Sequence, residues 1–164
     1  MTAGEAIVVA FMFVTLSACH SAGNKAAHKA PPPQDVTPGS TFTVTQRFAI
    51  PSGDAGVYLQ DTRLYSEEQL QPNYPFCRFE TVGVSGELID RGVYTVTGVD
   101  YEENGTGPGG MDVSVTDIRL QAQTTGKTYH LNCMLPLVSY GARFVTPDEI
   151  QGAVGGYMTL RDEP

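Results

Sequence analysis

The sequence has no tryptophan, few charged side chains and a marked shortage of basic ones. Lysine and arginine together number 10, against 18 aspartate and glutamate residues, which gives a formal net charge of −8. Nucleic-acid binding depends on basic side chains that neutralise phosphate, so this balance argues against a nucleic-acid partner. It also argues against adsorption of a folded part to anionic lipid. The length of 164 residues and the 41% hydrophobic content fit one ordinary domain with a core.

The sequence also lacks an apolar run long enough to span a bilayer as a helix. The apolar run at residues 6–16 has only about half of the roughly 20 residues that a spanning helix needs. Its length fits the apolar region of a secretory signal peptide. Residues 1–5 before it carry Glu5 and no Lys or Arg, whereas signal peptides usually open with a basic residue.

Small residues follow this run and end at a cysteine, in the order Leu16-Ser17-Ala18-Cys19. This segment resembles the lipobox of bacterial lipoproteins. The resemblance implies that residues 1–18 are a signal peptide and that Cys19 receives a diacylglyceryl group and an acylated amino terminus. Each buried CH₂ contributes about 0.8 kcal/mol, so such an anchor in the membrane would be close to permanent. The alternative is an ordinary cleaved signal with an unmodified Cys19.

The residues after Cys19 concern location and attachment. In lipoproteins of this kind an Asp in the next position favours the inner membrane, whereas this chain has His20, so the resemblance implies a periplasm-facing place on the outer membrane. Residues 19–40 are small, polar and rich in Pro and Ala, which is typical of a disordered tether. His20 and His28 lie on this tether without a fixed ligand geometry, so we do not expect them to bind metal.

From Thr41 onward, apolar and polar residues alternate as in half-buried strands. The pattern predicts a single mainly β domain over residues 41–164, a small antiparallel barrel or sandwich. One short helix is expected after Thr146, because the segment TPDE supplies an N-cap residue, a proline at the first helical position and a capping box. Gly155 and Gly156 end it. The predicted strands cover residues 41–50, 57–61, 76–84, 92–101, 111–123, 127–135 and 157–161.

One of these strands changes parity along its length. Val113 and Val115 are apolar at odd positions, whereas Ile118 and Leu120 are apolar at even positions. A regular strand cannot place both sets on one face. The pattern therefore predicts a β-bulge near residues 116–117.

Apart from Cys19, the sequence contains two cysteines, Cys77 and Cys133. Export would place them in an oxidising compartment, where such a pair is usually joined. The alternation lets both sulfurs point into the core, and closing a loop of this length contributes about 4 kcal/mol. Redox chemistry is the competing interpretation, but it usually uses a Cys-x-x-Cys spacing that is absent here. We predict a structural disulfide between Cys77 and Cys133.

Catalytic candidates are few. His130 is the only histidine after residue 40, and the alternation of Tyr129, His130 and Leu131 directs it away from the apolar face. A serine hydrolase would need it beside a nucleophile and a carboxylate. The best serine context, GVSG at residues 83–86, lacks the glycine pattern of a nucleophile elbow. We expect a solvated strand residue rather than a general base.

Two acidic features allow alternative interpretations. Asp100, Glu102 and Asn104 resemble the start of a calcium loop, but Met111 stands where a bidentate Glu is needed, so they are weak metal candidates and a hairpin loop is favoured. The acidic pairs at 67–68 and 102–103 match the two acids of glycoside hydrolysis or a solvated surface. Several tyrosines fit a recognition surface or cross-strand packing equally well: Tyr58, Tyr65, Tyr74, Tyr94 and Tyr101.

Three segments of the folded part carry a second resemblance: AIPSGDAGVYLQ at 49–60, YPFCRFE at 74–80 and GVYTV at 92–96. They are similar to a family of small uncharacterised proteobacterial envelope lipoproteins. The resemblance implies shared fold and a disulfide at Cys77, without an activity. We expect a lipid-anchored, non-enzymatic binding or structural module with an unknown envelope protein as partner and no cofactor. The alternatives are a lysozyme-inhibitor-like lipoprotein, whose acidic face would suit a basic enzyme, and a hydrolase of envelope polymers.

Overall fold

The computed structural model describes residues 36–83 and 86–161. The predicted signal peptide, Cys19, His20 and His28 lie outside these residues, as does most of the predicted tether. At the end of that tether, Val36 and Ser40 are already buried. The amide of Gly39 donates to the carbonyl of Val96 at 2.9 Å, so this end of the segment is attached to the sheet.

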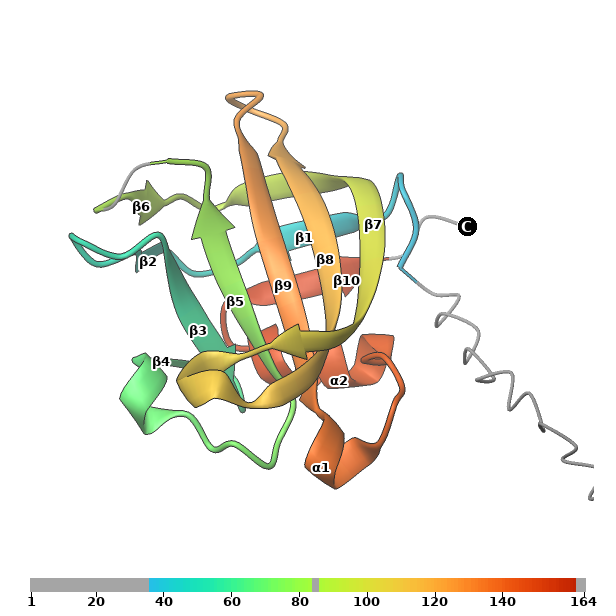
Figure 1. Ribbon diagram of the computed structural model, residues 1–164. Helices are drawn as coiled ribbons and strands as arrows, with labels where there is room; N and C mark the ends of the chain where they lie inside the picture. Colours follow the sequence, from blue (N-terminus) through green and yellow to red (C-terminus); the bar gives the residue numbers. More distant parts are fainter. Residues whose placement is uncertain (1–35, 84–85, 162–164) are drawn as a thin grey trace, which may run out of the picture.

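The fold is mainly β, as predicted. The strands of the large sheet are β1 (Thr41–Val44), β3 (Gly56–Gln60), β4 (Arg63–Tyr65), β5 (Phe76–Thr81), β7 (Gly92–Thr106), β8 (Asp112–Ala122), β9 (Thr128–Pro136) and β10 (Met158–Arg161). They form an eight-stranded antiparallel sheet in the order β10-β1-β7-β8-β9-β5-β3-β4. This sheet curls into a half-barrel (Figure 1). A separate two-stranded sheet joins β2 (Phe48–Ala49) to β6 (Leu88–Ile89).

The predicted helix is α2 (Pro147–Val154), and it packs against the inner side of the half-barrel. Its capping box is confirmed, because the Thr146 side chain accepts a bond from the Glu149 amide at 3.3 Å and the Glu149 carboxylate accepts one from the Thr146 amide at 2.9 Å. Ile150, Ala153 and Val154 are its buried residues. The shorter helical segments are η1 (Glu67–Gln69), η2 (Pro108–Gly110) and α1 (Leu137–Tyr140).

The main core lies between α2 and the inner face of the sheet. Aromatic rings fill one part of it: the centroid of Phe79 is 5.2 Å from that of Phe48, 5.3 Å from that of Tyr129 and 6.3 Å from that of Tyr94. Burial raises the pKa of the Tyr94 phenol to about 12. The core therefore keeps this group protonated, and its O–H donates to the Asp90 carbonyl oxygen at 3.0 Å.

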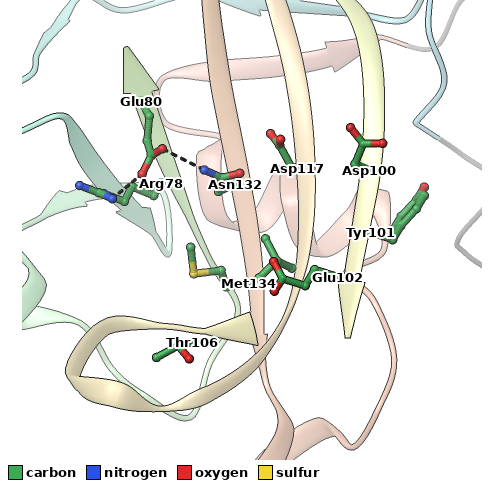
Figure 2. Close-up of a pocket in the computed structure, with 10 residues that line it drawn as sticks. Arg78, Glu80, Asp100, Tyr101, Glu102, Thr106, Asp117, Asn132 and Met134 are labelled. Carbon is green, nitrogen blue, oxygen red and sulfur yellow. Dashed lines mark hydrogen bonds and ion pairs between the residues drawn. The ribbon is translucent and has the colours of Figure 1, made fainter. Parts of the chain in front are cut away.

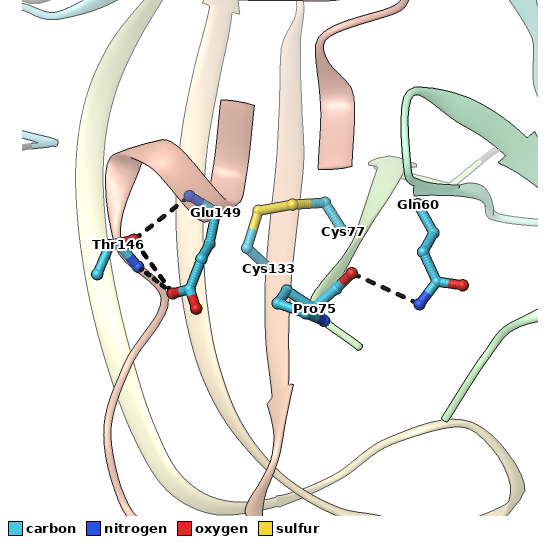
Figure 3. The surroundings of a disulfide bond; sticks show 6 residues. All are labelled: Gln60, Pro75, Cys77, Cys133, Thr146 and Glu149. Atoms are coloured by element: carbon cyan, nitrogen blue, oxygen red, sulfur yellow. Dashed lines mark hydrogen bonds between the residues drawn. A yellow bond between two sulfur atoms is a disulfide. The ribbon is translucent and has the colours of Figure 1, made fainter. Parts of the chain in front are cut away.

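The predicted disulfide is present in this core (Figure 3). Cys77 on β5 and Cys133 on β9 are directly opposite each other, with their Cα atoms 4.0 Å apart. Both residues are buried. The bond thus joins two neighbouring strands that lie 56 residues apart in the chain.

The predicted bulge at residues 116–117 is wrong. β8 pairs with β9 in one continuous register from Val113 to Gln121, and the register shifts lie in β7 instead, between Val96 and Gly98 and between Glu102 and Gly105. The change of parity has another cause. Ile118 and Leu120 face the main core, whereas Val113 and its neighbours face a second, smaller cluster on the other side of the sheet.

Two strand boundaries also differ from the expectation. The predicted strand 41–50 divides, because β1 ends at Val44 and the chain then leaves the large sheet so that β2 can pair with β6. β7 continues past the predicted end at residue 101 as far as Thr106. It bends at Asn104, whose φ is 63°, a left-handed conformation that Asn tolerates better than most residues.

Candidate functional site

The outer face of the sheet carries a band of polar side chains across its middle strands. Arg78 on β5 is opposite Asn132 on β9, and Asn132 is opposite Asp117 on β8. Asp117 is in turn opposite Asp100 on β7. These residues alternate with inward-facing core residues on their strands, so the strand period places all of them on one face.

A groove of about 410 Å³ lies along this band (Figure 2). Strands β5, β9, β8 and β7 supply most of its lining, and Thr106 near the end of β7 closes one side. Carboxylates predominate among its charged groups, with Arg78 as the basic group. The lining residues are Arg78, Glu80, Asp100, Tyr101, Glu102, Thr106, Val115, Asp117, Asn132 and Met134.

The wall of this groove exists because the far end of the β7–β8 hairpin folds across β9 and β5 toward η1 (Figure 1). Beneath it, four residues form what we call the outer cluster: Tyr58, Phe76, Val113 and Met134. The amide of Gly109 in η2 donates to the Glu67 carboxylate at 3.2 Å and links the hairpin to η1. The outer cluster therefore holds the hairpin end in place.

A second hollow adjoins the groove, and a third adjoins the second. The second, of about 540 Å³, shares Arg78 with the groove and is lined by Tyr58, Tyr65 and Asp54. The third, of about 420 Å³, lies beside η2 and shares Glu67 and Glu68 with the second hollow. We call the three together the acidic trough. Its carboxylates are Asp54, Glu67, Glu68, Glu80, Asp100, Glu102 and Asp117.

Among the described residues that line the trough, Arg78 alone has a basic side chain. Its guanidinium is paired with the Glu80 carboxylate, and its Cζ lies 5.3 Å from the ring centroid of Tyr58. The Asn132 amide donates to the other oxygen of Glu80 at 3.1 Å (Figure 2). Burial raises the pKa of the Tyr58 phenol, against the opposing effect of Arg78. The positive charge of Arg78 is thus already compensated.

The other carboxylates differ in how they are partnered. Asp100 forms an ion pair with Arg119 at 3.1 Å, and a Cβ on Gly98 would clash with the Arg119 guanidinium, so glycine at this position lets Arg119 lie across the strand. The carboxylates of Glu68 and Glu102 make no hydrogen bond or ion pair with the described part of the chain. These two side chains are exposed and remain available to a partner.

His130 lies on the outer face, as its sequence position indicates. Its Nδ1 is 2.9 Å from the Asp117 carboxylate, and its side chain is 30% exposed. Ser85 of the GVSG segment lies outside the described residues. The expectation that His130 is not a general base stays a prediction.

The weak metal candidates occupy a strand rather than a calcium loop. Asp100 and Glu102 are two residues apart on β7, which explains their alternation, and Asn104 is at the bend of that strand. Within residues 36–83 and 86–161, no three His, Cys, Asp or Glu side chains are placed to hold a metal ion.

The structure brings some of the acidic residues and tyrosines that the sequence suggested together in the trough. Glu67, Glu68 and Glu102 reach the trough, as do three of the tyrosines, whereas Tyr94 is in the core and Tyr74 is exposed elsewhere. No local sequence pattern singled out Arg78, Glu80, Asp117 or Asn132, because only strand register makes them neighbours.

No protein-family model, curated protein or solved structure matches the chain. The resemblance to small envelope lipoproteins therefore stays a prediction. Within the described part of the chain, no helix is both long and apolar enough to cross a bilayer.

Proposed function

We propose that this protein is a lipid-anchored module of the bacterial envelope that binds another envelope component through the acidic trough. The lipobox-like segment ending at Cys19 supports export and anchoring. The joined Cys77–Cys133 pair supports an oxidising compartment, where structural disulfides persist.

The acidic trough is the observation that carries the binding role. It concentrates carboxylates, tyrosines and two methionines on one side of the sheet, and three of its acids, Asp54, Glu68 and Glu102, have no side-chain partner within the described chain. Solvent-exposed concave surfaces with aromatic residues are typical of recognition sites. The main core lies on the opposite face of the sheet, so the charged side chains of the trough are not part of it.

Crosslinking in intact cells tests the binding role. A photo-crosslinking amino acid in place of Thr106, which is exposed at the trough, should capture a discrete partner. The same amino acid in place of Val138, which is 94% exposed on α1, should not. Identical capture at both positions, or none at Thr106, would contradict the proposal.

The anchor is tested separately. Palmitate labelling of the full-length protein should disappear in the variant Cys19→Ala, because the thiol is the acyl acceptor in the motif that the segment resembles. Labelling that persists in this variant would overturn the anchor.

A second candidate is a lysozyme-inhibitor-like lipoprotein, which the charge of the trough favours, because an acidic concave face suits a basic enzyme. An excess of the purified protein should then slow the hydrolysis of cell walls by lysozyme. An unchanged rate would exclude this candidate and leave the general binding role intact.

A further inference from the structure

We infer that the acidic trough binds an extended polypeptide segment bearing several lysine or arginine side chains. This inference rests on the proposed binding function and adds the chemistry of the partner. It follows from the shape of the trough, from its charge, and from the way in which the protein's own arginine is seated there.

The shape suits an extended chain. The lining passes from Asp100 on β7 across β8, β9, β5 and β3 to Tyr65 on β4, and the hollows adjoin through shared residues. Five steps between neighbouring strands at about 4.8 Å each correspond to roughly 24 Å. An extended segment of about seven residues has this length at ~3.3 Å per residue. A compact small molecule would occupy only one of the hollows.

The charge selects a cationic segment. The carboxylates are spread along the trough, from Asp100 at one end to Glu68 at the other, rather than gathered at one point. No cluster that would hold a metal ion is present in the described residues. A partner that matches this spread needs several positive charges at intervals, as a Lys- or Arg-bearing segment provides.

Arg78 shows how the trough receives a cation. Its guanidinium lies over the Tyr58 ring at 5.3 Å from the centroid and pairs with the Glu80 carboxylate. An aromatic face and a carboxylate together are a favourable site for guanidinium or ammonium groups. Tyr65 and Glu68, which line the same hollow, offer these two groups to a partner's side chain.

The apolar part of the lining fits the rest of such a side chain. Met134 and Val115 line the groove beside Glu102. Lysine and arginine carry aliphatic stems that pack on apolar surface while the charged end stays in contact with polar groups. The groove therefore matches both parts of these residues, whereas a purely inorganic cation would leave the apolar lining unused.

Fluorescence anisotropy with a labelled nonapeptide of alternating lysine and alanine tests the inference on the full-length protein in detergent micelles. The peptide should bind, and the corresponding glutamate–alanine peptide should not. The variant E68Q/E102Q should raise the Kd about tenfold, because it removes two carboxylates that would pair with lysine side chains of the peptide. Both replaced side chains are exposed and unpaired, so folding is preserved.

The variant D61N/D148N is the matched control, because it removes the same net charge at two exposed positions outside the trough. It should change the Kd less than about twofold. Equal weakening by both variants, or no binding of the lysine peptide, overturns the inference. If the partner that is captured through Thr106 in cells lacks a basic segment, the inference is overturned but the proposed function stands. If no partner is captured at all, the proposed function itself is contradicted.

Discussion

The two faces of one sheet differ in what covers them. The inner face packs against α2, β2 and β6, and it holds the disulfide and a cluster of aromatic rings in edge-to-face and tilted contact. The outer face is covered only at one end, where the β7–β8 hairpin folds over the outer cluster, and the rest carries charge. Alternation along a strand places its side chains on two faces, but the elements that pack on each face decide which of the two sets becomes a core.

This difference separates stability from recognition. A residue of the inner face is held by neighbours from several strands and from α2, so its loss leaves a cavity. The residues of the outer band are bonded mainly to each other and to solvent, as Arg78, Glu80 and Asn132 illustrate. Substitutions on the two faces should therefore separate cleanly in their effects on unfolding.

The largest expected effect is on the inner face. The variant F79A removes a fully buried ring that contacts three other rings, so we expect a loss of up to about 5 kcal/mol in the free energy of unfolding, the upper end for such a change. Urea unfolding followed by circular dichroism measures it. The control Y74A, at a residue 57% exposed, should cost about 0.5 kcal/mol or less. A loss below about 3 kcal/mol in F79A, the lower limit for Phe→Ala truncations, would contradict this account of the core.

Loss of the disulfide comes next. In the variant C77A/C133A the free energy of unfolding should be about 4 kcal/mol lower, because the unfolded chain regains the conformational entropy that the disulfide loop removes. Urea midpoints with and without a reducing agent measure this loss. The reducing agent should have no effect on the double variant. Free thiols detected in the native, folded protein would contradict the disulfide itself.

A smaller loss is expected in the outer cluster. Met134 is buried at 9% exposure but belongs to a cluster of only a few residues, so M134A should cost about 2 kcal/mol. Because the hairpin end rests on this cluster, the same variant should increase hydrogen exchange in β7 near Asn104. If M134A destabilised the protein as much as F79A does, it would be wrong that the inner face contributes more to stability than the outer cluster.

The smallest expected effect depends on pH and lies at the rim of the inner face. The Arg143 guanidinium bonds both oxygens of Glu149, at 2.6 Å and 2.8 Å, and holds the pKa of that carboxyl below its usual range. A lowered pKa in the folded state means that the stabilisation is present above the pKa of the unfolded chain and is lost as the pH falls through the lowered value. At neutral pH it should amount to about 1 kcal/mol, since the pair is partly exposed.

The variant E149Q measures this contribution. In a series of urea unfolding curves, its free energy of unfolding should fall below that of the unsubstituted protein. This difference should be largest near pH 7 and should shrink as the medium becomes acidic. The variant D148N, at the exposed neighbouring position, controls for charge in the first turn of α2. A deficit of E149Q that stays constant over the whole pH series would rule out the ion pair as its cause.

Several elements were predictable from short stretches of sequence. The Thr146–Glu149 capping box starts α2 where the residues indicated, and the alternation around Cys77 and Cys133 placed both sulfurs toward the core. The parity change between Val115 and Ile118 was visible too, but its interpretation as a bulge was wrong. The sequence pattern shows which residues share a face, and it carries no information on whether a distant hairpin covers the second face.

The candidate site was predictable only in fragments. Glu67, Glu68 and Glu102 stood out as acidic pairs, yet nothing local connects η1 with β7. They line one trough because β7 bends at Asn104 and its hairpin reaches across to Glu67. Such a contact depends on the packing of Val113 and Met134, which come from different strands.

The sequence by itself determined the class of fold, the start of α2 and the joining of the two core cysteines. Each of these depends on interactions within a few residues or on which face of a strand a residue occupies. Only the tertiary structure decided the register of the middle strands, the cover of the outer face and the assembly of the trough. These depend on contacts between segments far apart in the chain, and local periodicity does not encode which distant segment will supply them.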